Sequence, residues 1–78
     1  MITIRLFAAA HEAAGKSQME VTAGSLREIL EFMQRDNSRL KSVFNRCSYL
    51  IDGVAAHDFD LALPDGSTVD VLPPFAGG

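Results

Sequence analysis

The chain has 78 residues, of which 47% are hydrophobic and 22% charged, so it is expected to form one small globular domain rather than a disordered segment. Its net charge of −3 argues against nucleic acid as the main partner. The single cysteine excludes an internal disulfide. With no run of 18 apolar residues and no signal-like segment, we expect a cytoplasmic protein without a membrane partner. A carrier, an adaptor or a small subunit suits this size better than an enzyme with a large pocket.

The first part of the chain predicts two strands separated by a short helix. Residues 2–7 alternate apolar and polar side chains, which is the period of a half-buried strand. Residues 8–14 are good helix formers, and Gly15 suits the position just after a helix. Residues 18–22 alternate again and predict the second strand.

The main helix is predicted over residues 26–36. Ser25 and Glu28 have the spacing of a capping box, in which each side chain accepts a hydrogen bond from the backbone of the other residue. Another short helical piece follows near residues 40–44. The apolar stripe expected to face the core consists of Leu26, Ile29, Leu30 and Met33.

The second half predicts two or three strands joined by turns. The apolar run at 49–51 ends at Asp52-Gly53, a turn signal, and residues 54–55 start a brief edge strand. Residues 64–67 form a second turn with the proline at its first corner, and 68–72 are the last strand. The order of elements predicts an α+β domain in which one main helix crosses a face of a sheet of four or five strands.

Charge is unevenly distributed along the sequence. Residues 1–46 contain all seven basic residues and five acidic ones, whereas residues 47–78 contain five aspartates and no basic residue. Two interpretations remain open: a solvated acidic loop region, or a docking face for a basic surface of a partner.

The last six residues, 73–78, are expected to form a flexible arm beyond a domain of residues 1–72. Pro73 and Pro74 remove two backbone donors and favour an extended conformation. Six extended residues reach up to about 20 Å. Gly77 and Gly78 carry no Cβ, so this arm can enter a narrow channel. Phe75 is its one large side chain and could anchor in a pocket of a partner, with Ala76 between them.

The α-carboxylate of Gly78 is the candidate reactive group of the arm. It is ionised at neutral pH because its pKa is about 3.5. A carboxylate is a poor electrophile and needs activation, for example as an acyl-adenylate, before it accepts sulfur or an amine. The alternative interpretation is a frayed terminus without function.

Three other residues could carry chemistry. Cys47 lies beside the start of an apolar strand, so we interpret it as a buried, unreactive thiol. His11 and His57 are expected at the surface, and neither lies near a nucleophile at catalytic spacing. The three residues lack the spacing of a metal site, so no metal is expected.

The sequence resembles the sulfur-carrier branch (the MoaD/ThiS family) of the ubiquitin-like β-grasp proteins, and within it most of all the small subunits of molybdopterin synthase. The double proline and the diglycine are the specific features. Two departures are an Asp-Gly turn where the family usually has Asn-Gly, and Phe75 where valine is frequent. The shared motifs are Phe7-Ala8, residues 12–15, Ser25-Leu26, Asp52-Gly53, residues 64–66 and residues 72–78.

This resemblance implies a β-grasp fold and a carrier that is not an enzyme by itself and binds no cofactor. An E1-like adenylating enzyme would use ATP to adenylate Gly78, and a persulfide donor would convert the carboxylate to a thiocarboxylate. Residues 73–77 would place the arm in the large catalytic subunit of molybdopterin synthase, which transfers the sulfur to a pterin precursor in molybdenum cofactor biosynthesis.

Three alternatives remain open from the sequence. The protein could carry sulfur for thiamine or cysteine synthesis, or modify other proteins by forming isopeptide bonds through Gly78. It could also be a non-covalent ubiquitin-like adaptor whose terminus takes no part in chemistry.

Overall fold

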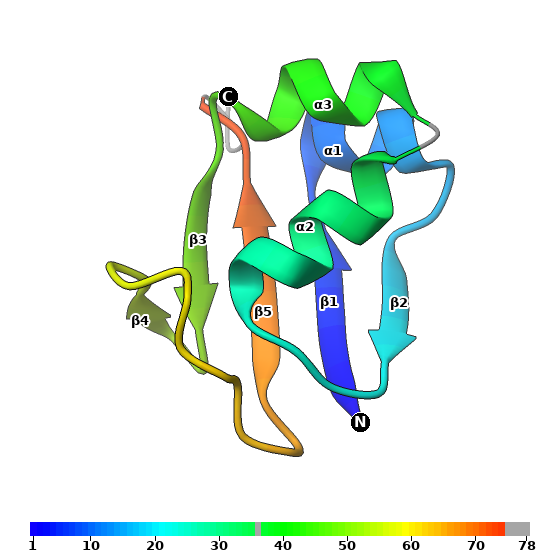
Figure 1. Cartoon of the computed structure of the whole chain (residues 1–78). Helices are drawn as coiled ribbons and strands as arrows, with labels where there is room; N and C mark the ends of the chain where they lie inside the picture. The colour runs from blue at the N-terminus through cyan, green and yellow to red at the C-terminus, as the bar shows by residue number, and fades with distance from the viewer. Residues whose placement is uncertain (36, 75–78) are drawn as a thin grey trace.

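The described residues form one mixed β-sheet with helix α2 across one face and helices α1 and α3 together at one end of it (Figure 1). The computed structural model describes residues 1–35 and 37–74. The strands lie in the order β2-β1-β5-β3-β4. β1 and β5 are parallel neighbours, and the other neighbouring pairs are antiparallel. The strands are β1 (Ile2–Leu6), β2 (Gln18–Val21), β3 (Ser48–Ile51), β4 (Val54–Ala55) and β5 (Thr68–Leu72).

Two of the three helices, α2 and α3, begin at a residue whose side chain caps them. The predicted capping box of α2 is confirmed: Ser25 Oγ accepts from the Glu28 backbone N–H at 3.2 Å, and Glu28 Oε1 accepts from the Ser25 N–H at 2.9 Å. Asn37 caps α3 by accepting from the Leu40 N–H at 3.1 Å. The helices are α1 (Ala8–Ala14), α2 (Leu26–Gln34) and α3 (Ser38–Phe44). None of these helices, in residues 1–35 and 37–74, is long and apolar enough to cross a membrane.

The main helix is shorter than the predicted 26–36. It ends at Gln34, because Arg35 serves as the C-cap and its N–H turns to the Phe32 carbonyl, three residues back. The next helix already has its N-cap at Asn37. Residue 36 lies outside the described residues.

The core lies between the sheet and the helices. The predicted alternation of β1 and β5 is confirmed, since the inward side chains of both strands are buried. The predicted helix stripe also faces the core, with Met33 only partly buried at its end. The buried apolar residues are Ile2, Ile4, Leu6, Ala10, Leu26, Ile29, Leu30, Leu40, Phe44, Tyr49, Val69 and Val71.

Both predicted turns are present, one with a different geometry. Asp52 and Gly53 have φ of 49° and 84°, as a tight hairpin between β3 and β4 requires. In the second turn the Ser67 N–H donates to the Pro64 carbonyl at 3.1 Å, so the proline precedes the corners instead of occupying the first one. Asp65 and Gly66 form the corners, and Gly66 takes a φ of 89° that suits glycine.

These observations confirm the predicted α+β class. The sheet has five strands, and α2 crosses one face of it in front of β1 and β5 (Figure 1). Segment 57–63 contains one isolated bridge between Ala62 and Ser25 and no longer strand.

Candidate functional site at the end of the central strand

The middle strand of the sheet, β5, leads directly into the predicted arm. Its last paired residue is Leu72, opposite Ser48 of β3. Pro73 follows and is buried, whereas Pro74 is exposed. Because neither proline has a backbone N–H, neither can donate to the ladder of β3. The chain therefore leaves the sheet at Pro73 and reaches the surface at Pro74.

A groove of about 370 Å³ lies at this exit point. Its walls come from three segments far apart in the sequence, and apolar groups predominate among them. Among the described residues, Arg46 supplies the charged side chain of the lining. The lining residues are Ala9 of α1, Ser42 and Val43 of α3, Arg46, Pro73 and Pro74.

Helices α1 and α3 form the two helical walls because they pack against each other. The Asn37 side chain joins them: its Nδ2 donates to the Ala13 carbonyl at 3.0 Å while its Oδ1 caps α3. One residue thus fixes both the start of α3 and its position beside α1.

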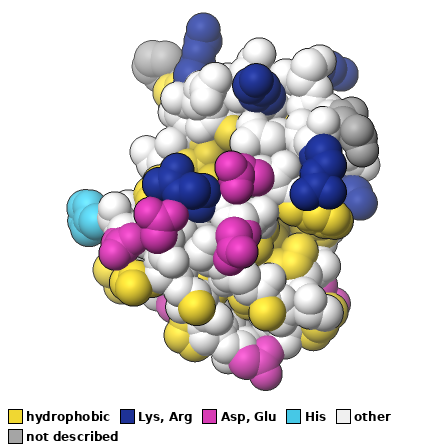
Figure 2. Space-filling view, viewed as in Figure 1, with side chains coloured by type: hydrophobic (Ala, Val, Ile, Leu, Met, Phe, Trp, Pro, Cys, Tyr) yellow, Lys and Arg dark blue, Asp and Glu magenta, His cyan; other side chains and the backbone are white. Residues whose placement is uncertain are grey.

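Helix α3 and the segment that follows it are basic. Residues 37–51 contain three basic side chains and no acidic one. In Figure 2 dark blue side chains stand at the upper end, where α3 lies in Figure 1, and others lie in the middle beside magenta ones, whereas the lower end of this view shows magenta. The exit point of the arm therefore adjoins a cationic surface.

Of the predicted site residues, the structure places Pro73 and Pro74 at this groove. Phe75, Ala76, Gly77 and Gly78 lie outside the described residues. The groove itself was not predicted from the sequence. The sequence predicted a short helical piece near residues 40–44. No pattern in it indicated that one side of this helix would line a groove together with the end of β5.

A second exposed cluster lies on the sheet side of the molecule. Arg5 and Asp70 pair across β1 and β5, with Nε to Oδ1 at 2.5 Å and Nη2 to Oδ2 at 2.8 Å. The Arg5 guanidinium also lies 5.8 Å from the ring centre of Phe7, which is 38% exposed. Its hydrogen bond and charge interaction with Asp70 raise the pKa of Arg5. The two hydrogen bonds to Asp70 hold the guanidinium beside the aromatic ring.

The predicted unreactive character of Cys47 agrees with its surroundings, although the residue is half-buried rather than buried. Its Sγ donates to the Val43 carbonyl at 3.2 Å. Burial raises the pKa of the Cys47 thiol to about 11. At neutral pH the thiol is protonated, so it is a poor nucleophile.

The histidines lie where the sequence predicted them. His11 and His57 are both exposed. Within residues 1–35 and 37–74, no group of three His, Cys, Asp or Glu side chains is placed to hold a metal ion.

Three of the five aspartates in the acidic half are paired with cations of the first half. Asp70 pairs with Arg5, Asp60 Oδ1 lies 2.6 Å from Arg27 Nε, and Asp65 pairs with the N-terminal amino group. The acidic segment therefore closes onto basic groups of the same chain, which favours an intramolecular role over a free docking face for a basic partner.

Comparison with known protein families shows to which family this chain belongs. The profile of the ThiS family matches residues 4–78. The chain belongs to the ThiS family. This is the family of small ubiquitin-like sulfur carriers predicted above, whose members are not catalytic alone. The matched range includes Pro73 to Gly78, so every predicted site residue of this ThiS family member falls within the family pattern.

Solved structures match this ThiS family chain over nearly its full length. Small archaeal modifier protein 1 (SAMP1) from Methanosarcina acetivorans is 22% identical, with a TM-score of 0.81 over 99% of this chain and 95% of that one. SAMP1 from Haloferax volcanii is 25% identical, with a TM-score of 0.74 over 99% and 98%. Subunit 1 of molybdopterin-converting factor from Helicobacter pylori, solved in complex with subunit 2, is similar in fold: 21% identity, TM-score 0.73, and coverage of 99% and 97%.

These likenesses confirm the predicted ubiquitin-like β-grasp fold. A comparison with curated proteins found no match.

Proposed function

We propose that this protein is the sulfur carrier subunit of molybdopterin synthase and that it carries sulfur as a thiocarboxylate on Gly78. The observation that carries the proposal is the ThiS family match, which extends through the diglycine to residue 78. The likeness to subunit 1 of the Helicobacter pylori molybdopterin-converting factor, which was solved together with its subunit 2, supports a large catalytic subunit as the partner.

The chemistry requires activation of the Gly78 carboxylate by another protein. A carboxylate oxygen attacks the α-phosphorus of ATP on an E1-like adenylating enzyme, and pyrophosphate leaves. The terminal sulfur of a persulfide donor then attacks the acyl carbon, and AMP leaves. A thiol cleaves the resulting S–S bond, which leaves the thiocarboxylate on Gly78 and a disulfide on the thiol side. The sulfur then passes to a pterin precursor in the large subunit.

The described residues supply the base of the arm. Pro73 is anchored at the end of the central strand, and Pro74 is exposed beside the groove formed with Ala9, Val43 and Arg46. A partner that holds the carboxylate can therefore contact α1 and α3 at the same time. In this proposal the rigid β-grasp domain serves as a handle, and the catalytic groups belong to the partners.

Reconstitution with the adenylating enzyme, ATP, a persulfide donor and the large subunit tests the proposal. We expect mass spectrometry of the loaded protein to show one oxygen replaced by sulfur, and pterin product to form. Deleting Gly78 or adding a residue after it should abolish both results. Val54→Ala is a matched control, because Val54 is exposed on β4 and lies outside the groove. Normal product formation by the protein lacking Gly78 would contradict the thiocarboxylate mechanism.

Gly77→Ala tests the clearance of the arm separately. An added methyl group should hinder entry of the arm into a narrow channel and slow loading or transfer. Its melting temperature should equal that of the parent chain, because residue 77 lies beyond the last strand. An unchanged loading rate would show that the position tolerates a Cβ.

Protein modification through Gly78 is the second candidate, and the TM-score of 0.81 to SAMP1 favours it. In that case the activated carboxylate would form an isopeptide bond with a lysine of another protein. Incubation with the adenylating enzyme, ATP and lysine-bearing proteins separates the two functions. Conjugates that carry this chain on lysine would support modification, whereas thiocarboxylate alone supports the carrier role. A carrier for thiamine or cysteine synthesis would form thiocarboxylate without pterin product.

A further inference from the structure

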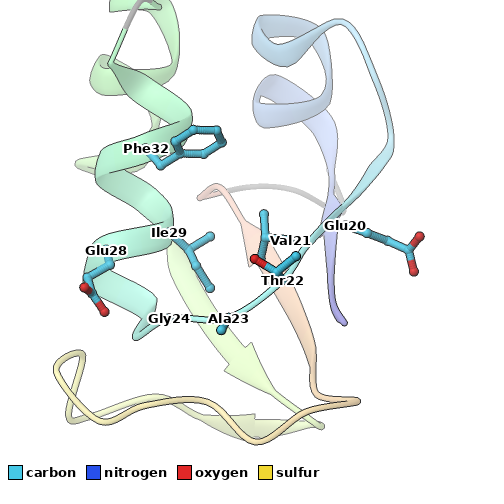
Figure 3. A pocket seen from close by; sticks show the side chains of 8 residues that line it. All are labelled: Glu20, Val21, Thr22, Ala23, Gly24, Glu28, Ile29 and Phe32. Carbon is cyan, nitrogen blue, oxygen red and sulfur yellow. The ribbon is translucent and has the colours of Figure 1, made fainter.

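A groove of about 360 Å³ lies between the edge strand β2 and helix α2, on the opposite side of β1 from β5 (Figure 3). Ile29 and Val21 point into it from its two sides, and Phe32 stands at one end. Ile29 is buried, but Phe32 is 57% exposed. The lining residues are Glu20, Val21, Thr22, Ala23, Gly24, Glu28, Ile29 and Phe32.

Phe32 also borders a second hollow, of about 190 Å³, on its other side, where Met19, Met33 and Lys16 contribute to the lining. Phe32 lines both hollows, and β2 and α2 contribute to both, whereas α1 and α3 also contribute to the second one. The Arg35 guanidinium lies 5.9 Å from the ring centre of Phe32 and restricts its position. We refer to these two hollows, which both border Phe32 and in which apolar surface predominates, as the channel beside β2.

The backbone of β2 is open along this channel. Within residues 1–35 and 37–74, β2 pairs with β1 and with no other strand. The Leu6 N–H donates to the Ser17 carbonyl at 2.8 Å, and this bond sets the alternation of the antiparallel pair. Gln18 and Glu20 therefore direct their backbone N–H and C=O groups away from β1. An edge with free donors and acceptors is a template for another strand, and β2 contains neither lysine nor proline to prevent pairing.

The negative charge of Glu20 indicates which side chains an added strand would carry. The Glu20 side chain points away from α2 (Figure 3), toward the other face of the sheet. A strand added beside β2 would place alternate side chains in the channel and the others beside Glu20. Apolar residues suit the first set, and a lysine or arginine suits the second. A second copy of this chain would offer the same acidic edge, so it complements Glu20 poorly.

We propose that an extended segment of a partner protein binds here as a sixth strand beside β2, with apolar side chains against Ile29 and Phe32 and a basic side chain against Glu20. The main-chain hydrogen bonds provide affinity, and the alternating side chains provide specificity. This surface is separate from the groove at Pro74, so its occupant need not compete with the partners that act on Gly78.

The capped peptide Val-Lys-Val-Lys-Val serves as the probe, and Val-Glu-Val-Glu-Val as its charge-reversed counterpart. Both are titrated into the full chain labelled with ¹⁵N, and backbone amide shifts are followed by NMR. We expect the lysine peptide to bind more tightly than the glutamate peptide, with the largest shifts at Gln18, Glu20 and Thr22. A lysine peptide methylated on alternate backbone nitrogens should lose binding, because it cannot pair with the strand edge.

Two variants and a control complete the test. Phe32→Ala should raise the Kd about tenfold or more through the lost apolar wall. Glu20→Lys should invert the preference, with a change of about two- to fivefold for each peptide. Leu61→Ala removes another exposed apolar side chain, 64% exposed and outside the channel, and should leave the Kd unchanged. Phe32 and Glu20 are exposed, so both variants are expected to fold, and their amide spectra verify this.

Three outcomes of the peptide titrations would overturn the proposal: no shifts with either peptide, shifts centred on another surface, or equal binding of the N-methylated peptide. Concentration-dependent shifts at Gln18 and Glu20 without peptide would instead identify a second copy of the chain as the occupant, which also overturns it.

Discussion

The Cys47 thiol illustrates how the surroundings of a residue decide its chemistry. Its folded pKa of about 11 exceeds the value of about 8.5 in an unfolded chain, because burial disfavours the thiolate. The protonated thiol therefore stabilises the folded state. This contribution is complete below about pH 8.5 and is lost as the pH rises through the folded pKa.

We expect slow alkylation of Cys47 by iodoacetamide in the native protein at pH 8.5 and rapid alkylation in urea at the same pH. The thiolate is the reacting species, and folding lowers its population. Mass spectrometry over time gives both rates. A native rate equal to that of the unfolded chain would place the Cys47 side chain in water and contradict its hydrogen bond to the Val43 carbonyl.

The sequence predicted an unreactive thiol at Cys47 but did not predict its degree of burial. Its position beside an apolar strand predicted a fully buried side chain, whereas the residue is half-buried. Exposure there depends on how closely the loop after α3 approaches neighbouring side chains such as Phe59, which lines the same hollow from a distant part of the chain. Such long-range neighbours leave no mark in the local pattern.

At the scale of helices and strands, short sequence patterns predicted the features that depend on neighbouring residues in the chain. The capping box of Ser25 and Glu28 fixed the start of α2, and alternation fixed the inward faces of β1 and β5. The predicted end of α2 at residue 36 was two residues too late, because no glycine or proline marks the end of this helix. The helix stops at Gln34, since the next helix already has its N-cap at Asn37.

Leu30→Ala should lower the free energy of unfolding by about 2–5 kcal/mol, since the Leu30 side chain is 7% exposed and its removal leaves a cavity under α2. Urea denaturation of the purified variant measures the change. Glu31→Ala is the matched control on the next residue, which is exposed, and should change stability by no more than about 0.5 kcal/mol. A loss below about 1 kcal/mol for Leu30→Ala would place this side chain outside the core.

At the scale of the whole molecule, the order of elements predicted the class of fold but not its surfaces. The parallel pairing of β1 with β5 joins the two ends of the chain, and it brings Asp70 to Arg5 and Asp65 to the amino group of Met1. These ion pairs neutralise part of the negative charge of residues 47–78. The sequence could not reveal this neutralisation, because it depends on contacts between residues more than 60 positions apart.

The same three-dimensional arrangement leaves Arg46 as the charged wall of the groove beside Pro74. If partners that act on the arm approach this end of the molecule, complementary charge on them should accelerate the encounter. Arg46→Glu should therefore slow sulfur loading or transfer about tenfold at low ionic strength, with a smaller effect in high salt because exposed charges are screened. Initial rates in the reconstituted system at limiting partner concentration measure this change.

Arg39→Glu is the matched control for Arg46→Glu, since it makes the same charge change at an exposed residue of α3 outside the groove lining. Both variants should keep the melting temperature of the parent chain, because neither arginine belongs to the buried core. Equal slowing by both variants would point to the net charge of the molecule rather than to a contact at the groove. No slowing by Arg46→Glu would show that partners reach the arm without approaching the end of α3.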